Sequence, residues 1–247
     1  MPRYRICFSR GEEQNYLSHL DLMRTLTRAL RRAALPVQYS RGFNPQPRLV
    51  FAAPLPVGIT TEADFFDLFL KEELAEAQIH ALLNDNLPQG LKIVSVYTVR
   101  EDAPPLMAEV EAALYVVSLD NAGIEGKWAT VRETLQAAIA DICATDELVV
   151  ERKGKKKTKK VNIRPFILEI SFQEESAEEI SIRILLQTGN KGGARPDEVL
   201  AALCQRVPWS FKELYNPRIH RQKLFKRACQ VLVPLATDKT TDNMERR

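Results

Sequence analysis

Apolar positions in the first hundred residues switch between the spacing of strands and the spacing of helices. Strand-like segments, rich in aromatic and β-branched residues, are predicted at residues 4–8, 37–39, 48–52, 65–70 and 91–99. Two segments, 17–34 and 72–84, carry leucine and alanine at helical spacing. The first half of the chain is therefore predicted to run β-α-β-β-β-α-β, and Ser18 and Asp21 have the spacing of a capping box at the first helix.

A similar order follows Pro104 and Pro105, which mark a linker. Strands are predicted at 112–119, 148–151, 165–172, 180–186 and 219–225, and helices at 128–143 and 195–204. We therefore predict an α+β protein of two tandem ferredoxin-like units, each an antiparallel sheet with its helices on one face. The predicted boundaries are 1–103 for the N-terminal unit, 106–235 for the C-terminal unit with a basic hairpin at 152–164, and 236–247 for a mobile tail.

Composition indicates a globular protein, because 45% of the 247 residues are apolar and 27% are charged. No apolar run reaches the roughly eighteen residues of a membrane span, and the N-terminus lacks the apolar core of a signal peptide. Cys7, Cys143, Cys204 and Cys229 lie far apart among apolar or helical residues, which favours buried, reduced thiols and a cytoplasmic protein. No CxxC pair is present, and we expect neither a metal nor a cofactor.

Basic charge is local, although the formal net charge is only +3. Residues 1–50 carry nine basic and three acidic side chains, and residues 151–164 carry eight basic and one acidic side chain. Residues 51–150 carry five basic and seventeen acidic side chains. One face could therefore hold a polyanion. Nucleic acid is the obvious candidate, although an acidic protein would satisfy the same charge pattern.

The start of the helix predicted at 17–34 places an imidazole and a carboxylate two residues apart, at His19 and Asp21. A helix N-terminus favours anions, so this position could hold a phosphate or host proton transfer. The alternative is that Ser18 and Asp21 cap the helix while His19 packs locally. His19 and Asp21 are therefore the candidates for catalytic residues.

The same helix places Arg24, Arg28 and Arg31 on one face, where they either bind an anion or stay solvated. Arginine has a planar fork of donors that suits phosphate. Arg41 and Arg48 lie close by in the sequence and extend this basic region.

The loop at residues 42–47 combines a flexible glycine, two stiffening prolines, the aromatic Phe43 and the amide of Asn44. An aromatic loop tip can stack on a base or dock into a partner. The alternative is an ordinary connection in which Phe43 folds back onto the core.

A lysine run follows in the second half and is too basic to pack, so it should form a solvated hairpin tip or strand extension. Its candidate phosphate-binding residues are Lys153, Lys155, Lys156, Lys157, Lys159 and Lys160. Counterion release would make such binding fall steeply with salt, with a slope of about −0.7 per neutralised phosphate on single strands. Near the C-terminal end, Arg218 and His220 would share one face of a strand.

A set of motifs in the N-terminal part carries a family resemblance. The motifs are LSHLDLMR at 17–24, RALRRA at 28–33, YSRGFNPQPR at 39–48 and PLPVG at 54–58. With them the chain resembles an uncharacterised bacterial family called the radical-SAM-linked proteins, most densely over residues 3–70. In that family the domain is fused to a radical SAM protein or encoded beside one. The resemblance implies a radical SAM partner, and because the cysteine triplet of a radical SAM cluster is absent, it implies the free-standing accessory form.

These observations lead to one expected function and two alternatives. We expect an accessory protein without catalytic activity of its own, which binds tRNA or rRNA and presents it to a radical SAM enzyme. One alternative is an RNA-processing or RNA-modifying enzyme that uses His19 as acid or base. The other is a protein-interaction module that binds the radical SAM enzyme without touching RNA. The sequence leaves the oligomeric state open.

Overall fold

The computed structural model describes residues 1–120, 128–154, 157–174, 179–189, 192–207 and 217–235, which form a mixed α+β protein with five α-helices. The chain divides into two compact units. The first contains Met1–Glu111 and the segment that begins at Arg221, and the second contains Ala112–His220. The predicted α+β class is confirmed, and the tail predicted at 236–247 lies outside the described residues.

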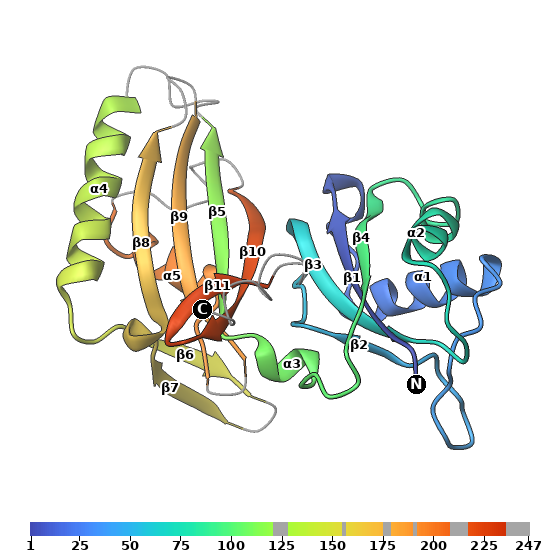
Figure 1. Ribbon diagram of the computed structural model, residues 1–247. Helices are drawn as coiled ribbons and strands as arrows, with labels where there is room; N and C mark the ends of the chain where they lie inside the picture. The colour runs from blue at the N-terminus through green and yellow to red at the C-terminus, as the bar shows by residue number, and fades with distance from the viewer. Residues whose placement is uncertain (121–127, 155–156, 175–178, 190–191, 208–216, 236–247) are drawn as a thin grey trace. The chain divides into compact units, whose positions relative to one another are not determined.

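The first unit follows the order β-α-β-β-α-β. Its elements are β1 (Arg3–Arg10), α1 (His19–Arg32), β2 (Leu49–Phe51), β3 (Ile59–Phe69), α2 (Glu76–Asn84) and β4 (Leu91–Thr98), followed by the short helix α3 (Leu106–Glu109) (Figure 1). β1 pairs antiparallel with β3 and β4, and β2 pairs antiparallel with β3, which gives the strand order β4-β1-β3-β2. β10 (Arg218–Ala228) also lies next to β3, and β11 (Val231–Pro234) pairs with β10.

The core of this unit lies between one face of the sheet and the two longer helices. Alternate residues of a strand point to the same face, and here they are apolar. The core includes Tyr4, Ile6 and Phe8 of β1, Phe66 and Leu68 of β3, Leu22, Leu26 and Leu30 of α1, and Ile79 and Leu83 of α2. Both helices therefore cover the same face of the sheet, which leaves the outer side of α1 available for other contacts (Figure 1).

The ends of α1 are set by local chemistry. The hydroxyl of Ser18 accepts a hydrogen bond from the backbone N–H of Asp21 at 3.2 Å, so the predicted N-cap is present. After the last helical residue, Ala34 adopts φ +51°, the left-handed region that usually holds glycine. Pro36 then prevents the helix from continuing.

Residues 37–39 do not form the strand predicted there. Val37 and Tyr39 each make only one isolated bridge. Pro36 precedes this segment, and Pro47 is the bridge partner of Tyr39. Both prolines lack the N–H groups that a continuous β-ladder needs. The strand prediction was wrong because it considered the aromatic and β-branched residues but not the backbone N–H groups that the prolines lack.

A buried charge cluster fixes the connection after β4. Asp67 of β3 accepts hydrogen bonds from Arg3 at 2.5 Å and from Arg5 at 2.9 Å. Arg5 also donates to Glu109 of α3 at 2.6 Å. Removing one partner of such a cluster would leave an uncompensated buried charge. Arg5 thus positions α3 and takes no part in the basic surface.

Two further arginines of this unit are also structural. Arg221 of β10 is buried and forms an ion pair with Asp64 of β3, so it does not belong to a basic surface near the C-terminal end. Arg10 donates to backbone carbonyls, including that of Leu17 at 3.0 Å, and burial lowers its pKa to about 10.

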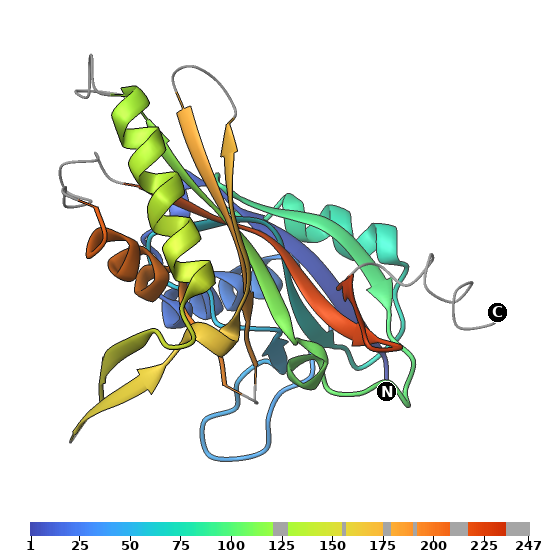
Figure 2. The same ribbon diagram turned by 90° about the vertical axis from the view of Figure 1, so that its left-hand side faces the viewer.

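The second unit carries its own antiparallel sheet. Its elements are β5 (Ala112–Asp120), α4 (Trp128–Ala144), β6 (Val149–Lys153), β7 (Thr158–Asn162), β8 (Ile167–Glu174), β9 (Glu179–Gln187) and α5 (Pro196–Cys204). β5, β9 and β8 pair in that order, and β6 pairs with β7 as a separate hairpin. α4 runs along β8, with α5 beside it, and the β6–β7 hairpin extends away from the sheet (Figure 2).

The four cysteines are free thiols, but they are not all buried. Cys7 lies in the core, where burial raises its pKa to about 12. Cys143, in the last turn of α4, and Cys229, in the turn between β10 and β11, are exposed. The expectation of four buried thiols was therefore wrong, because an apolar or helical neighbourhood in sequence does not decide which side of the element a residue occupies.

Candidate functional site

Arginines of α1 line a hollow on the outer side of the helix, which we call the arginine hollow. Arg24, Arg28 and Arg31 are exposed and lie on one helical face. The hollow measures about 420 Å³ and is closed on its other side by Gln46, Pro47 and Leu49. Among the described residues, no carboxylate lines it. Arg24 pairs with Asp21 at 3.2 Å, but both side chains are substantially exposed to solvent, and such pairs contribute little.

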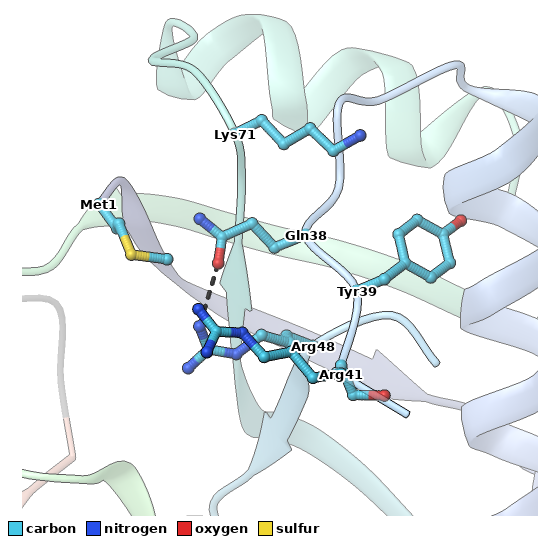
Figure 3. A pocket seen from close by; sticks show the side chains of 7 residues that line it. Met1, Gln38, Tyr39, Arg41, Arg48 and Lys71 are labelled. Carbon is cyan, nitrogen blue, oxygen red and sulfur yellow. Dashed lines mark hydrogen bonds between the residues drawn. The ribbon is translucent and has the colours of Figure 1, made fainter. Parts of the chain in front are cut away.

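A second hollow, the loop hollow, lies beside the start of the connection between α1 and β2 and measures about 710 Å³. Three cations line it, Arg41, Arg48 and Lys71, together with Gln38 and Tyr39 (Figure 3). Met1 and Ser40 complete its lining, so no carboxylate is present here either. Concentrated positive charge without a paired carboxylate is an arrangement that attracts anions.

Arg48 is held in place before any ligand arrives. Its guanidinium lies over the ring of Phe69 at 4.2 Å from the ring centre and donates to Oε1 of Gln38 at 3.0 Å (Figure 3). Stacking and hydrogen bonding together restrict the rotamers of a side chain that is otherwise flexible. Less conformational entropy is then lost when an anion binds.

Two hydrogen bonds between Ser40 and Gln46 close the loop within the connection between α1 and β2. The N–H of Ser40 donates to the carbonyl of Gln46 at 2.8 Å, and the N–H of Gln46 donates to the hydroxyl of Ser40 at 3.0 Å. Gly42 adopts φ +141°, which favours glycine at this bend. Phe43 at the tip is fully exposed and Asn44 is exposed as well. Phe43 therefore does not fold back onto the core.

His19 and Asp21, the candidates for catalytic residues, contact different groups. The ring of His19 packs edge-on against Phe51 with 4.9 Å between ring centres, and burial lowers the pKa of His19. Asp21 instead bonds to the hydroxyl of Ser18 at 2.6 Å and to Arg24, and these contacts lower the pKa of Asp21. The two side chains thus have separate partners.

His19 lines a third, smaller hollow of about 270 Å³, which we call the apolar hollow. Its other lining residues are Met23, Leu49, Val50, Phe51, Pro54 and Met107. Met23 and Leu49 also line the arginine hollow, so the two hollows adjoin.

The basic hairpin of the second unit, β6–β7, presents lysines to solvent. Lys153, Lys157, Lys159 and Lys160 are exposed, and we call this segment the lysine hairpin. Lys155 and Lys156 lie outside the described residues.

The arginines at the two ends of the lysine hairpin have structural roles. Arg152 forms a two-bond ion pair with Glu198 at 2.6 and 2.8 Å, and Arg164 donates to backbone carbonyls, including that of Cys143 at 3.0 Å. Of the remaining candidates, Arg218 is exposed and His220 is half-buried, two positions apart on β10.

Comparison with known sequence families decides the relationship of the chain. Residues 3–196 match the family described as "Uncharacterized protein conserved in bacteria (DUF2344)". The chain belongs to the DUF2344 family. A search of curated proteins finds no match. The family description names neither a reaction nor a radical SAM protein, so the expected radical SAM partner stays a prediction.

The match to DUF2344 contains the lysine hairpin and, apart from Met1, all the lining residues of the three hollows, but it ends before Arg218 and His220. Within the described residues of this DUF2344 chain, no group of three His, Cys, Asp or Glu side chains could hold a metal ion. None of its described helices is long and apolar enough to cross a membrane.

Several residues of the loop hollow in this DUF2344 chain were not predicted, among them Gln38 and Lys71. The backbone explains their position, because the N–H of Gln38 bonds to the carbonyl of Phe69 at 2.9 Å and the N–H of Lys71 bonds to that of Pro36 at 2.8 Å. The sequence contained part of the information needed to place Lys71. Pairing the end of the strand predicted at 65–70 with residues 37–39 would have placed Lys71 next to this loop.

Proposed function

We propose that this DUF2344 protein is a cytoplasmic accessory protein of a radical SAM enzyme, and that it binds tRNA or rRNA without catalysing a reaction itself. Its first unit would act as a ferredoxin-like platform that presents arginines to the RNA backbone. The order β4-β1-β3-β2, with both longer helices on one face, supports a ferredoxin-like assignment for this unit. In the second half, β5, α4, β8, β9, α5 and β10 follow the same β-α-β-β-α-β order, with the β6–β7 hairpin inserted after α4, and this supports a second such unit.

One observation carries the RNA proposal. Two hollows of the first unit are lined by Arg24, Arg28 and Arg31 and by Arg41, Arg48 and Lys71, and neither contains a carboxylate. Cations that balance a fold are normally paired with acidic groups, as Arg5 and Arg221 are in this unit. Six cations in two carboxylate-free hollows are better explained by a polyanion with repeated phosphates.

The lysine hairpin would add a second, less specific contact surface. Its exposed lysines are mobile point charges, which attract phosphates without fixing their geometry. Phe43 at the loop tip would add stacking on a base, because it presents its whole ring to solvent.

The alternative of an RNA-modifying enzyme receives less support. It would use His19 as acid or base, yet no carboxylate orients the imidazole and the ring packs on Phe51. The alternative of a protein-interaction module would use the same basic hollows for acidic side chains of the radical SAM enzyme. A measurement of RNA binding distinguishes this alternative from the RNA proposal.

Fluorescence anisotropy of labelled tRNA, measured over a series of salt concentrations, tests the proposal. We expect binding at low salt whose logarithm falls linearly with the logarithm of salt concentration. The same titration is repeated with the radical SAM enzyme present and after nuclease treatment of the complex. No tRNA binding under any of these conditions, together with a complex that survives nuclease, would replace the RNA proposal with the protein-interaction alternative.

A further inference from the structure

The apolar hollow and the arginine hollow adjoin, and we call the two together the groove. Met23 and Leu49 line both hollows and separate an apolar end from a basic end. The three α1 arginines lie at the basic end, and aromatic and thioether side chains lie at the apolar end. A ligand that fills the whole groove must therefore carry negative charge beside a flat or compact apolar group.

The apolar end has walls that are already in place. Phe51 and His19 pack edge-on, and Phe51 is also in contact with Phe8 and Phe66 of the core. Met107 also lines this end, and it belongs to α3, which the Arg5–Glu109 ion pair fixes. A preformed pocket binds its ligand without the entropic cost of ordering its walls.

Among the described residues that line this end, His19 alone carries a side-chain nitrogen that can form a hydrogen bond. Its Nδ1 is buried without a hydrogen-bond partner in the described part of the chain, which is uncommon for a buried polar atom. Its Nε2 is not among the buried unpartnered atoms and has no protein partner among the described residues. A ligand in this hollow could therefore form a hydrogen bond with the imidazole.

We propose that the apolar hollow takes one unstacked base of the bound RNA, while the neighbouring phosphates lie on Arg24, Arg28 and Arg31. This inference rests on the proposed RNA binding and adds a base-binding pocket to it. An RNA strand has the required sequence of groups, because an apolar ring with hydrogen-bonding edges alternates with a charged phosphate. The volume of about 270 Å³ is below the roughly 300–1,000 Å³ of pockets for drug-sized ligands, and it suits a smaller ring.

An apolar peptide is a poorer occupant of this groove. Its side chains would fit the apolar end, but an adjoining row of three arginines would require acidic residues in register with them. Single-stranded RNA supplies the negative charge in every repeat. The charge complementarity of the basic end therefore selects RNA as the occupant.

The test compares two labelled oligomers of equal length and charge, oligoadenylate and an oligomer of the same sugar-phosphate backbone in which hydrogen replaces every base. Dissociation constants are measured at one low salt concentration for the wild type, Met107→Ala, His19→Ala and Val94→Ala. Val94 is the matched control because it is an apolar residue of β4 with the same 48% exposure as Met107. Thermal unfolding of each variant identifies any that fails to fold.

We expect the wild type to bind oligoadenylate at least about fivefold more tightly than the abasic oligomer, since stacking a single base contributes about 1–3 kcal/mol. Met107→Ala and His19→Ala should weaken only the binding of oligoadenylate, whereas Val94→Ala should change neither constant. Because Met107 is exposed on a short helix, we expect Met107→Ala to fold. This variant therefore still tests the base pocket if His19→Ala unfolds.

Two results separate the failure of this inference from the failure of the proposed function. Tight binding of both oligomers by the wild type with equal constants, or a base preference that neither pocket variant reduces, overturns the base pocket and leaves RNA binding intact. No binding of either oligomer or of tRNA at low salt overturns RNA binding, and the base pocket with it.

Discussion

The basic residues of the two units differ in how firmly they are held. In the first unit Arg48 is stacked on Phe69 and bonded to Gln38, and the α1 arginines project from a helix anchored in the core. In the second unit the lysines project from a two-stranded hairpin that is separate from the main sheet of that unit.

The two groups of basic residues are therefore expected to contribute to RNA binding in different ways. Arginines on fixed elements present donors at defined positions, so they can select a particular arrangement of phosphates. Lysines on an exposed hairpin raise the local concentration of any polyanion and lose more side-chain entropy on binding. We therefore expect the first unit to provide most of the affinity and specificity, and the lysine hairpin to provide a general electrostatic contribution.

The largest effect is expected from the triple variant Arg24→Gln, Arg28→Gln and Arg31→Gln. Loss of three phosphate contacts should weaken tRNA binding about a hundredfold at 0.1 M salt and reduce the salt slope by about 2 on single-stranded RNA. Anisotropy titrations across salt concentrations measure both quantities. The matched control is Lys92→Gln, Arg100→Gln and Arg195→Gln, which removes three exposed positive charges outside the hollows. Equal losses in the two triple variants would contradict the account.

Neutralising the lysine hairpin should have a smaller effect. Substitution of Lys153, Lys157, Lys159 and Lys160 by glutamine is expected to weaken tRNA binding about tenfold, because mobile contacts are only partly formed. The base preference of the protein should remain unchanged, and this is measured with the oligoadenylate and abasic oligomers. A loss larger than that of the arginine triple variant would reverse the ranking of the two regions.

A third prediction concerns the anchor of the lysine hairpin. Glu198→Gln should weaken the contact between Arg152 and α5 by about 1–2 kcal/mol, since an ion pair becomes a hydrogen bond between the charged guanidinium and a neutral amide. Hydrogen exchange of the β6–β7 amides measures this loss. Amides of β1 in the first unit serve as the control and should exchange as in the wild type.

The same ion pair predicts a pH dependence. Burial alone would raise the pKa of Glu198, but hydrogen bonds from Arg152 and from the backbone of Arg195 outweigh it and lower the pKa below the ordinary 4.5. The stabilising contribution of Glu198 is therefore present above pH 4.5 and is lost as the pH falls through the lowered value. The protection factors of the hairpin amides, which correct for the intrinsic pH dependence of exchange, should fall in that acidic range, and this loss of protection should be absent in Glu198→Gln.

The smallest effect is expected from exchanging one cation for the other. Arg48→Lys keeps the charge but loses the stacking on Phe69 and the planar donor fork, so tRNA binding should weaken a few-fold. The reverse exchange at the hairpin, Lys160→Arg, should change the dissociation constant by less than that. Equal effects at the two positions would show that only the charge matters in both regions.

The sequence was sufficient for most elements and insufficient where partners distant in the chain decide the outcome. Periodicity located α1, and the glycine and prolines of the loop marked its unusual connection. β11 was missed because the turn before it uses Cys229 and Gln230 at positive φ, where the usual glycine signal is absent.

The candidate site shows the same limit. Helical spacing alone placed Arg24, Arg28 and Arg31 on one exposed face, as the structure has them. No local pattern distinguishes the buried Arg5 and Arg221 from those surface arginines, because their partners lie more than sixty and one hundred and fifty residues away along the chain. The sequence identifies which side chains are charged, whereas only the fold shows which carboxylate pairs with each of them.

Arginine footprinting tests the central claim most directly. The protein is treated with phenylglyoxal with and without saturating tRNA, and modified peptides are quantified by mass spectrometry. We predict that tRNA protects Arg24, Arg28, Arg31, Arg41 and Arg48, whereas exposed Arg195 of the second unit stays as reactive as in the free protein. Equal protection of Arg195 and the hollow arginines, or no protection of the hollow arginines by bound tRNA, would contradict the account.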